Sequence, residues 1–259
     1  MPAPRVVIVI PTYDEADNIT ELLTRVRGAS PEADVLFVDD QSPDGTAERI
    51  REHTARDPRV FLMSGEEKQG LGAAYRAGFA WALDRGYDVV VQMDADLSHP
   101  PERISALVAA LDDADIAVGS RYVPQGSVQN WARSRRLISR LGNLYVRLVL
   151  AVPVHDTTAG FKAFRAEALH AIDVLNSTSN GYCFQIENTW KAHRAGLRIA
   201  EVPITFVDRT RGSSKMSGAI AAEALAEVLA WRWAELTRPR ADAPVAQERP
   251  TSRNDHAAA

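Results

Sequence analysis

Five short apolar runs alternate with amphipathic segments over the first half of the chain. The runs are 5–10, 34–40, 59–64, 87–94 and 115–122, and their β-branched and aromatic residues predict buried strands. The segments between them, 16–26, 47–55, 71–86 and 100–111, have apolar residues at helical spacing and predict helices. This alternation predicts an α/β fold, a Rossmann-like and mostly parallel sheet flanked by helices, whose ligands bind at the carboxyl ends of the strands.

Composition narrows the class of protein. The chain has 259 residues, of which 46% are hydrophobic, so it can bury a large core. A formal net charge of −4 gives no indication of a nucleic-acid partner. The single cysteine, Cys183, excludes an intrachain disulfide and a cysteine-based zinc site. The first apolar run is too short for a secretory signal, and no window approaches the roughly 18 apolar residues of a spanning helix, so we expect a chain that is soluble or lies on a membrane surface.

One segment is purely basic. Between Asp115 and Asp156 there is no acidic residue, whereas arginine stands at 121, 133, 135, 136, 140 and 147. Arginine binds phosphate oxygens with two parallel hydrogen bonds, so the segment favours an anionic partner. The alternative is a solvated basic face without a ligand.

Acidic residues follow several of the predicted strands. Asp44 and Asp17 are explained as helix caps, but Asp94 and Asp96 are not, because Pro100 places the next helix several residues later. In an extended segment, residues two apart point the same way, so these two carboxylates would repel one another. A hard divalent cation such as Mg²⁺ or Mn²⁺ would relieve the repulsion, with Ser98 as a further oxygen ligand.

Two familiar phosphate-binding motifs do not fit. The chain has no P-loop sequence. The stretch GLGAAY begins like a dinucleotide fingerprint, but Tyr75 stands where a small residue is required, and the stretch does not follow the first strand. An NAD-dependent oxidoreductase is therefore a remote alternative.

Eight segments, in order between Val6 and Ser217, carry a resemblance to a known family. They are PTYDEADNI, VDDQSPDGT, QGLGAAYRAG, MDADLSHPPE, VGSRY, DTTAGFKAFR, GYCFQIE and EVPITFVDRTRGSSKMS. Together they resemble the polyprenol-phosphate mannose synthases, whose best-known members are the dolichol-phosphate mannose synthases of glycosyltransferase family 2. The resemblance implies a GT-A fold, GDP-mannose as donor, Mg²⁺ or Mn²⁺ as cofactor, a polyprenyl phosphate as acceptor, and inversion at the sugar carbon.

The resemblance also implies roles for individual residues. The guanosine pocket would be lined by Pro11, Tyr13, Glu15, Val38 and Asp40. Asp94 and Asp96 would bind the metal and diphosphate, with Ser98 as a possible third metal ligand and Ala95 against the nucleotide. Arg121, Arg209 and Lys215 would hold phosphates. Singly, each residue has an ordinary structural explanation, and the ordered set favours the functional one.

The same resemblance implies an organisation for the chain. Residues 1–237 would form one GT-A domain, with a nucleotide-sugar-binding half at 1–122 and an acceptor- and membrane-facing half at 123–237. The tail at 238–259 is expected to be disordered because it lacks periodicity and is rich in proline, alanine and charge. The Gly- and Ser-rich stretch 210–218 is expected to act as a lid.

We expect a peripheral protein on the cytoplasmic face of the membrane. Leu137–Val152 and Ile220–Leu236 are the two segments that could dock, and a separate integral membrane protein could serve as a stable anchor. The alternative for Ile220–Leu236 is that it packs in the core or against the other segment.

Mechanism follows from the acceptor. A phosphate monoester has its second pKa near 6, so it is already largely dianionic at neutral pH and the transfer needs no catalytic base. Two other function classes remain open. One is a transferase with another donor or acceptor, such as UDP-glucose with polyprenyl phosphate, or a protein or polysaccharide transferase. The other is a non-catalytic module that binds a nucleotide sugar or a lipid phosphate.

Overall fold

The computed structural model describes residues 3–65, 67–179, 181–209 and 218–237, without the side chains of Tyr182 and 218–223. The strands are β1 (Val6–Thr12), β2 (Asp34–Asp39), β3 (Val60–Ser64), β4 (Val89–Gln92), β5 (Ile116–Ser120), β6 (Ser127–Gln129), β7 (Lys162–Arg165), β8 (Ile199–Pro203) and β9 (Thr205–Val207). The α-helices are α1 (Ala16–Ala29), α2 (Thr46–Thr54), α3 (Leu71–Asp84), α4 (Ile104–Ala110), α5 (Arg133–Leu150), α6 (Ala166–Ala171), α7 (Gly181–Arg194) and α8 (Gly218–Thr237). Two short 3-10 helices, η1 (Pro101–Arg103) and η2 (Val174–Asn176), complete the described elements.

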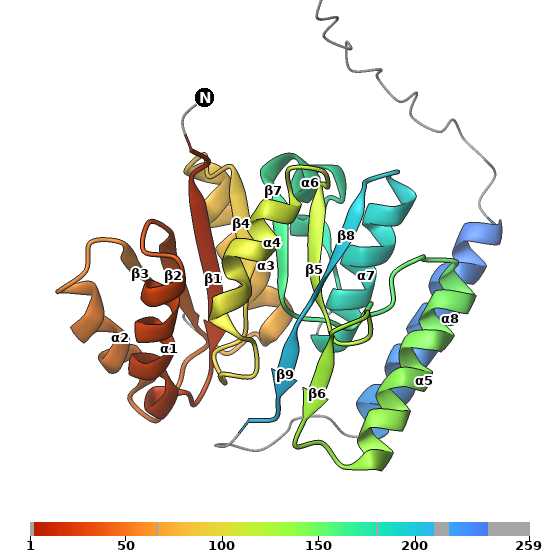
Figure 1. The fold of residues 1–259 in the computed structure, drawn as a ribbon, viewed down its shortest axis with the longest axis horizontal. Helices are drawn as coiled ribbons and strands as arrows, with labels where there is room; N and C mark the ends of the chain where they lie inside the picture. Colours follow the sequence, from red (N-terminus) through yellow and green to blue (C-terminus); the bar gives the residue numbers. More distant parts are fainter. Residues whose placement is uncertain (1–2, 66, 180, 210–217, 238–259) are drawn as a thin grey trace, which may run out of the picture.

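A central sheet carries the molecule (Figure 1). Its strand order is β3-β2-β1-β4-β7-β5-β8. All neighbouring pairs are parallel except those of β7, which runs antiparallel to both β4 and β5. The predicted α/β fold with a mostly parallel sheet is confirmed, and the antiparallel β7 is a strand that the pattern of apolar runs did not indicate.

Helices cover both faces of this sheet because its strands are apolar on both faces. Ile8 and Ile10 of β1 point into a core that includes apolar residues of α1, α2 and α4. Val7 and Val9 point to the other face, into a core with α3, α6 and α7. Each fully buried aliphatic or aromatic side chain contributes roughly 1.5–3 kcal/mol to folding, so strands buried on both faces read as continuous apolar runs.

The approach of α3 to the sheet depends on a glycine. A Cβ at Gly78 would lie 2.4 Å from Cγ1 of Val9, closer than real Cβ atoms come to another atom. The small residue therefore lets the middle of α3 lie directly on β1. This position matters for the site, because α3 also carries Tyr75 beneath the end of β4.

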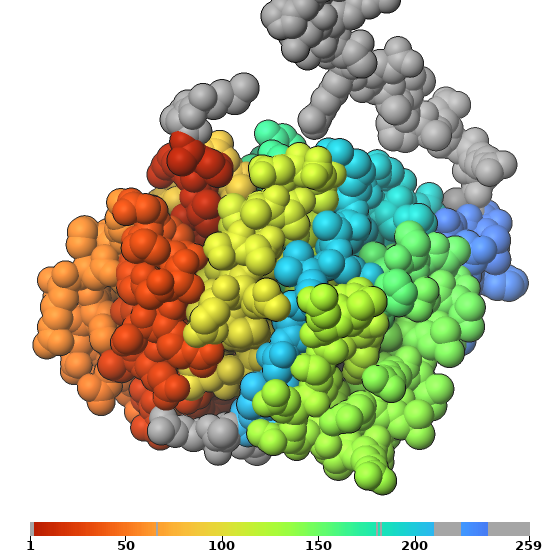
Figure 2. All heavy atoms as spheres, viewed as in Figure 1, coloured from red at the N-terminus to blue at the C-terminus, as the bar shows by residue number. Residues whose placement is uncertain are grey.

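The far end of the molecule is a pair of long helices, α5 and α8, which lie side by side (Figure 1). Val146 and Leu150 of α5 and Val228 of α8 meet in a third small core, and the Tyr145 hydroxyl donates to the Leu225 carbonyl at 3.0 Å. The two segments predicted to dock on a membrane thus pack against each other. The short parallel pair β6 and β9 stands between α5 and the central sheet. On the face shown in Figure 2, the chain of β8 and β9 runs between the α4 region and the segment that leads from β6 into α5.

Candidate active site

The two acids lie in a loop and not in a strand. β4 ends at Gln92, two residues before Asp94, so the alternation rule behind the predicted side-by-side arrangement does not apply here. Leu97, one residue beyond Asp96, has a φ of 63°, a left-handed conformation that bends the chain sharply. Asp96 supports this bend, because its Oδ1 accepts the Ser98 backbone N–H at 3.1 Å and the Ser98 hydroxyl at 2.5 Å. Ser98, predicted as a further oxygen ligand of the metal, is therefore hydrogen-bonded to Asp96.

Asp94 is held from beneath by groups that sequence reasoning did not single out as part of the site. Its Oδ1 accepts the Tyr75 hydroxyl at 2.8 Å, and its backbone N–H donates to His99 Nδ1 at 3.0 Å. Burial, followed by the nearby Asp94 charge, raises the pKa of Tyr75 well above its usual range, so the phenol keeps its proton. The Asp94 side chain is 36% exposed on its other side, where a ligand can reach it.

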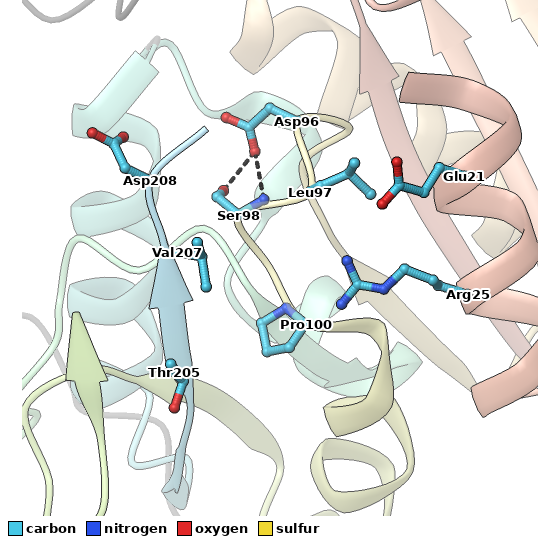
Figure 3. A pocket seen from close by; sticks show the side chains of 9 residues that line it. All are labelled: Glu21, Arg25, Asp96, Leu97, Ser98, Pro100, Thr205, Val207 and Asp208. Carbon is cyan, nitrogen blue, oxygen red and sulfur yellow. Dashed lines mark hydrogen bonds between the residues drawn. The ribbon is translucent and has the colours of Figure 1, made fainter. Parts of the chain in front are cut away.

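Asp96 has an ionic partner. Its Oδ2 lies 3.0 Å from Nη2 of Arg209, which follows β9. Arg209 was predicted to bind a phosphate, and here its guanidinium reaches the acid that was predicted to bind a cation. A pocket of about 190 Å³ opens beside Asp96 (Figure 3). It is lined by Glu21, Arg25, Asp96, Leu97, Ser98, Pro100, Thr205, Val207 and Asp208.

The residues predicted to line the guanosine pocket gather at the adjacent ends of β1 and β2. Pro11 and Val38 are direct partners in the register of these strands, and the Asp40 N–H donates to the Thr12 carbonyl at 3.0 Å. The Val38 side chain is buried against α3. The structure thus brings the predicted set together, although Val38 turns its side chain into the core.

Three members of this set are already engaged with the protein. The Asp40 carboxylate accepts the backbone N–H groups of Gln69 and Gly70 at 2.7 and 2.9 Å, immediately before α3. Glu15 Oε2 accepts the Asn18 side-chain amide at 2.6 Å. Lys68 Nζ lies 3.3 Å from the centre of the Tyr13 ring, a cation–π contact. Asp44 accepts the N–H groups of Ala16 and Thr46, the first residues of α1 and α2. The N-cap positions are nevertheless Glu15 and Gly45, and Asp17 lies inside the first turn of α1, so neither acid is the N-cap residue that the sequence predicted.

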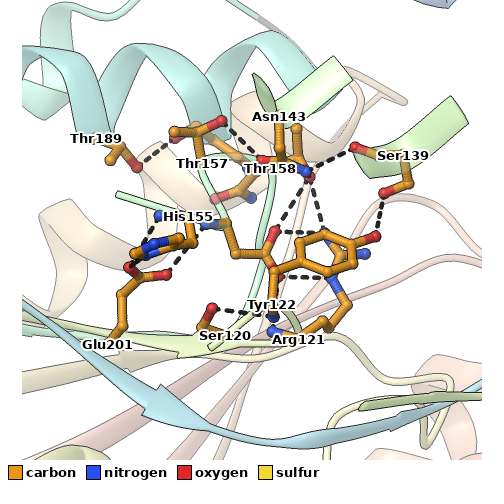
Figure 4. A network of polar contacts seen from close by, with 12 residues as sticks. Ser120, Arg121, Tyr122, Ser139, Asn143, His155, Thr157, Thr158, Thr189 and Glu201 are labelled. Carbon is orange, nitrogen blue, oxygen red and sulfur yellow. Dashed lines mark hydrogen bonds and ion pairs between the residues drawn. The ribbon is translucent and has the colours of Figure 1, made fainter. Parts of the chain in front are cut away.

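Arg121 is the centre of a buried polar network (Figure 4). Its Nε and Nη2 donate to the two oxygens of Asp156 at 2.7 and 2.6 Å, and its backbone N–H donates to Asp156 at 2.9 Å. Arg121 is 8% exposed and Asp156 fully buried, so each charge is balanced by the other. Its guanidinium also lies 5.5 Å from the ring centres of both Trp131 and Phe206. Arg121 as a phosphate ligand stays a prediction, and it would bring less net positive charge than an unpaired arginine.

The network reaches from Arg121 to α5. Nη2 of Arg121 donates to the Thr158 hydroxyl at 2.8 Å, and Asn143 of α5 donates to the same hydroxyl at 3.2 Å (Figure 4). The Thr157 hydroxyl in turn donates to Asn143 Oδ1 at 2.9 Å. Sequence reasoning assigned no role to Asp156, although this acid ends the long basic segment and begins DTTAGFKAFR, a segment of the family resemblance.

Lys162 is another buried charged residue of the described chain. It lies on β7 beside Gln92 of β4, and its Nζ donates to the Gln185 carbonyl at 2.8 Å and to the Thr189 hydroxyl at 2.9 Å. Burial lowers its pKa from 10.5 to about 7, although Asp156 opposes the shift. The Lys162 amine is therefore partly protonated and partly neutral near neutral pH.

The donor set fits a hard divalent cation that a ligand completes. Among the described residues, no group of three or more His, Cys, Asp and Glu side chains is placed to hold a metal. Asp94 and Asp96 would supply carboxylate oxygens, and Mg²⁺ and Mn²⁺ are commonly bound through one or two carboxylates plus waters and phosphate oxygens. Lys215 and most of the predicted lid, 210–217, lie outside the described residues.

Comparison with known proteins places the chain in a family. A family model described as glycosyl transferase family 2 matches residues 7–173. The chain therefore belongs to glycosyltransferase family 2.

Curated relatives narrow the resemblance. An undecaprenyl-phosphate mannosyltransferase of Micrococcus luteus is 50% identical over 233 residues, which is 88% of this chain and 96% of the relative. A polyprenol monophosphomannose synthase of Mycolicibacterium smegmatis is 50% identical over 89% of this chain and 88% of its own length. A dolichol-phosphate mannosyltransferase of Pyrococcus furiosus is 38% identical over 83% of this chain, which spans 60% of that relative. The resemblance to the polyprenol-phosphate mannose synthases is confirmed.

Solved structures confirm the fold. The glucosyl-3-phosphoglycerate synthase of Mycobacterium tuberculosis, in complex with Mn²⁺, UDP-glucose and phosphoglyceric acid, has a TM-score of 0.67 at 20% identity. The match covers 89% of this chain and 80% of that one. The complex with UDP alone has a TM-score of 0.66. This likeness supports the predicted GT-A fold and, at such low identity, nothing about the substrates of this chain.

Proposed function

We propose that this protein transfers mannose from GDP-mannose to a polyprenyl phosphate, forming polyprenyl phosphomannose and GDP with inversion at the sugar carbon. The observation that carries the proposal is the pair Asp94 and Asp96 after the central strand β4. Asp94 has one oxygen held by Tyr75, and Asp96 has one held by Ser98 and the other paired with Arg209. The relatives at 50% identity, named as mannosyltransferases of polyprenyl phosphates, support the choice of sugar and acceptor.

Asp94 and Asp96 would hold Mg²⁺ or Mn²⁺, with Ser98 close by through its bond to Asp96. The ion would supply positive charge to the diphosphate that departs with the nucleoside. Tyr13, Glu15 and Asp40 would bind the guanosine at the ends of β1 and β2, beside Pro11, Val38 and Ala95.

The acceptor needs screening and not deprotonation, because a phosphate monoester is largely dianionic at neutral pH. The side chains must then bring one anion towards another and align it with the sugar carbon. Among the described cations, Arg209 is proposed for this role first, because it forms an ion pair with Asp96. Lys215 and Arg121 are the other cations proposed to take part.

A transfer assay tests the proposal. Purified protein is incubated with polyprenyl phosphate and either radiolabelled GDP-mannose or radiolabelled UDP-glucose, and label in the lipid extract is counted. We expect transfer from GDP-mannose with Mg²⁺ or Mn²⁺ and loss of transfer in excess EDTA. Transfer from UDP-glucose alone would replace the donor, whereas binding of GDP-mannose without transfer from either donor would favour a non-catalytic module.

We also propose that α5 and α8 seat the protein on the cytoplasmic face of a membrane, where a lipid acceptor is found. Among the described residues, no helix is long and apolar enough to cross a bilayer. The outward stripe of α5 nevertheless exposes Leu137, Ile138, Leu141, Leu144 and Leu148 by 46 to 73%. On α8, Leu229, Trp233 and Leu236 are exposed in the same way. Such a stripe, flanked by Arg140 and Arg147, suits the interface of an anionic bilayer.

Vesicle sedimentation tests this contact. The wild type should bind vesicles rich in anionic lipid at low salt and be released at high salt, with a separate membrane protein providing any stable anchor. Leu141→Ser with Leu148→Ser should weaken binding about tenfold or more, because two exposed apolar side chains no longer enter the interface. Leu175→Ser is the matched control, since Leu175 is an exposed leucine on η2. Equal losses in both variants would exclude a specific role for α5.

A further inference from the structure

We propose that Tyr75 and His99 are positioning residues that orient Asp94 towards its ligand. Tyr75 fixes one oxygen of the carboxylate, and His99 fixes the backbone from which the carboxylate projects. The inference rests on the proposed function, because it takes Asp94 to be a ligand of a divalent cation. It assigns a purpose to two side chains that were not among the predicted site residues.

Tyr75 reaches Asp94 from a rigid position. Its ring is fully buried and stacks on Phe184 of α7, with ring centres 5.9 Å apart and planes within 1° of parallel. Phe79, one turn further along α3, lies 5.8 Å away. The hydroxyl is a polar group in an otherwise apolar cluster, and it gives its single proton to Asp94 Oδ1 at 2.8 Å. The packing of α3 against α7 therefore determines where this oxygen stands.

His99 contacts the backbone of Asp94. Its Nδ1 accepts the Asp94 N–H, so in the neutral ring the proton is on Nε2. Nε2 lies 3.9 Å from Asp94 Oδ2, beyond a hydrogen bond but facing that oxygen. The ring is held flat by Phe161, 5.2 Å away and 11° from parallel, and edge-on by Phe206. The backbone of Asp94 is thus tied to an aromatic stack built from β9 and the approach to β7.

Gly160 shows how closely the surrounding chain fits this arrangement. A Cβ at this position would lie 3.2 Å from His99 Cε1 and 3.4 Å from Asp94 Oδ2. A Cβ here would crowd the His99 ring and would make an ordinary van der Waals contact with the Asp94 carboxylate. The Asp94 carboxylate therefore has Tyr75, His99 and Gly160 as close neighbours, and its side chain is still 36% exposed.

The expected effect is on metal affinity more than on folding. Groups that hold a metal ligand by hydrogen bonds typically contribute 10- to 100-fold to metal affinity or activity. Tyr75→Phe removes only the hydroxyl and keeps the ring and its stacking. We expect Mn²⁺ affinity in the presence of GDP to fall about tenfold or more, measured by electron paramagnetic resonance of free Mn²⁺.

Tyr87→Phe is the matched control. Tyr87 is also buried. Its hydroxyl donates at 2.6 Å to Oδ2 of Asp34, which is the first residue of β2 and is not part of the proposed metal site. Tyr87→Phe also loses a hydrogen bond from a tyrosine hydroxyl to an aspartate, but at a different place, and it should bind Mn²⁺ like the wild type. Thermal unfolding of both variants shows whether a change in Mn²⁺ affinity follows from loss of structure.

Two substitutions of His99 examine the second contact without altering α3. His99→Asn places an amide oxygen near the position of Nδ1 and can keep the bond to the Asp94 N–H, whereas His99→Gln cannot. We expect Asn to retain more Mn²⁺ affinity than Gln. Unchanged affinity in Tyr75→Phe, together with equal affinity in the two His99 variants, would overturn the inference while leaving the metal site in place. A wild type that binds no Mn²⁺ with GDP would overturn the proposed metal site and the inference with it.

Discussion

Arg209 Nη2 lies 3.0 Å from Asp96 Oδ2, so a residue expected to meet phosphate is paired with a residue expected to meet metal. Each partner neutralises the other when no ligand is present. A cation at Asp96 would compete with the guanidinium for the same carboxylate oxygen. Release of Arg209 would then make its charge available to an incoming phosphate, so we expect donor and metal binding to be coupled through this pair.

Replacing Arg209 by alanine should therefore separate two effects. Mn²⁺ should bind the ligand-free protein several-fold more tightly, because a half-buried ion pair contributes about 1 kcal/mol and no longer competes. Transfer should fall by about tenfold or more, because one phosphate-facing charge is lost. Mn²⁺ titration without nucleotide and steady-state transfer assays give the two values. Weaker Mn²⁺ binding in the variant would contradict the competition.

Replacing either acid should abolish most activity. Asp94→Asn and Asp96→Asn each remove a charge with little change of shape, and we expect transfer to fall by at least about 10²-fold. Asp94→Asn can still accept the Tyr75 hydroxyl through its amide oxygen, so its fold should be preserved. Normal turnover of either variant in excess EDTA would remove the metal from the mechanism.

The buried pair of Arg121 and Asp156 should be more costly to break than to replace. Asp156→Ala leaves a guanidinium that is 8% exposed without its carboxylate, and we expect the free energy of unfolding to fall by about 3–5 kcal/mol. The double variant Arg121→Met with Asp156→Leu removes both charges and should recover much of this loss. Urea unfolding of Arg121→Met, of Asp156→Leu and of the double variant measures the coupling. A double variant as unstable as the sum of the two single ones would show that the pair acts independently.

Lys162 should make stability depend on pH. Its pKa is about 7 when folded and 10.5 in the ordinary state, so between these values the unfolded chain binds more protons. The free energy of unfolding of the wild type, relative to Lys162→Met, should therefore rise as pH increases from 7 to 9. The slope is at most about 1.4 kcal/mol per pH unit. Urea unfolding at several pH values gives the difference, and a difference that stays flat or falls with pH would contradict the buried neutral amine.

The sequence predicted the apolar parallel strands of the sheet but not the antiparallel strand β7 that joins them. β1, β2 and β5 are apolar on both faces, and this pattern is local, so their strands and helices could be found from the chain alone. β7 was missed because its four residues, Lys162–Arg165, have a positive charge at each end. Such a strand is recognisable only when its neighbours are known, since Lys162 finds its acceptors on α7.

The site shows the same division. Asp94 and Asp96 could be predicted because two acids after an apolar run are a local anomaly. Tyr75 was noted as a mismatch to a dinucleotide motif and lies in a segment of the family resemblance, but no role was predicted for it, whereas the structure places its hydroxyl on Asp94. Asp156 lies 35 residues from Arg121, and no spacing rule connects them. Contacts between distant parts of the chain depend on the topology, which a pattern of apolar runs does not determine.

The antiparallel β7 also has a consequence for how the chain is made. β4, which precedes the two acids, and β5, which precedes Arg121, do not touch as neighbours in the sheet, because β7 lies between them. A nascent chain of which only residues 1–122 have emerged from the ribosome therefore has two sheet edges, at β4 and β5, and lacks the strand that joins them. Synthesis must continue past Arg165 before β4 and β5 can be locked into one sheet. A fragment cut at 122 should accordingly expose apolar strand edges and aggregate, since unpaired edges of this kind recruit other chains.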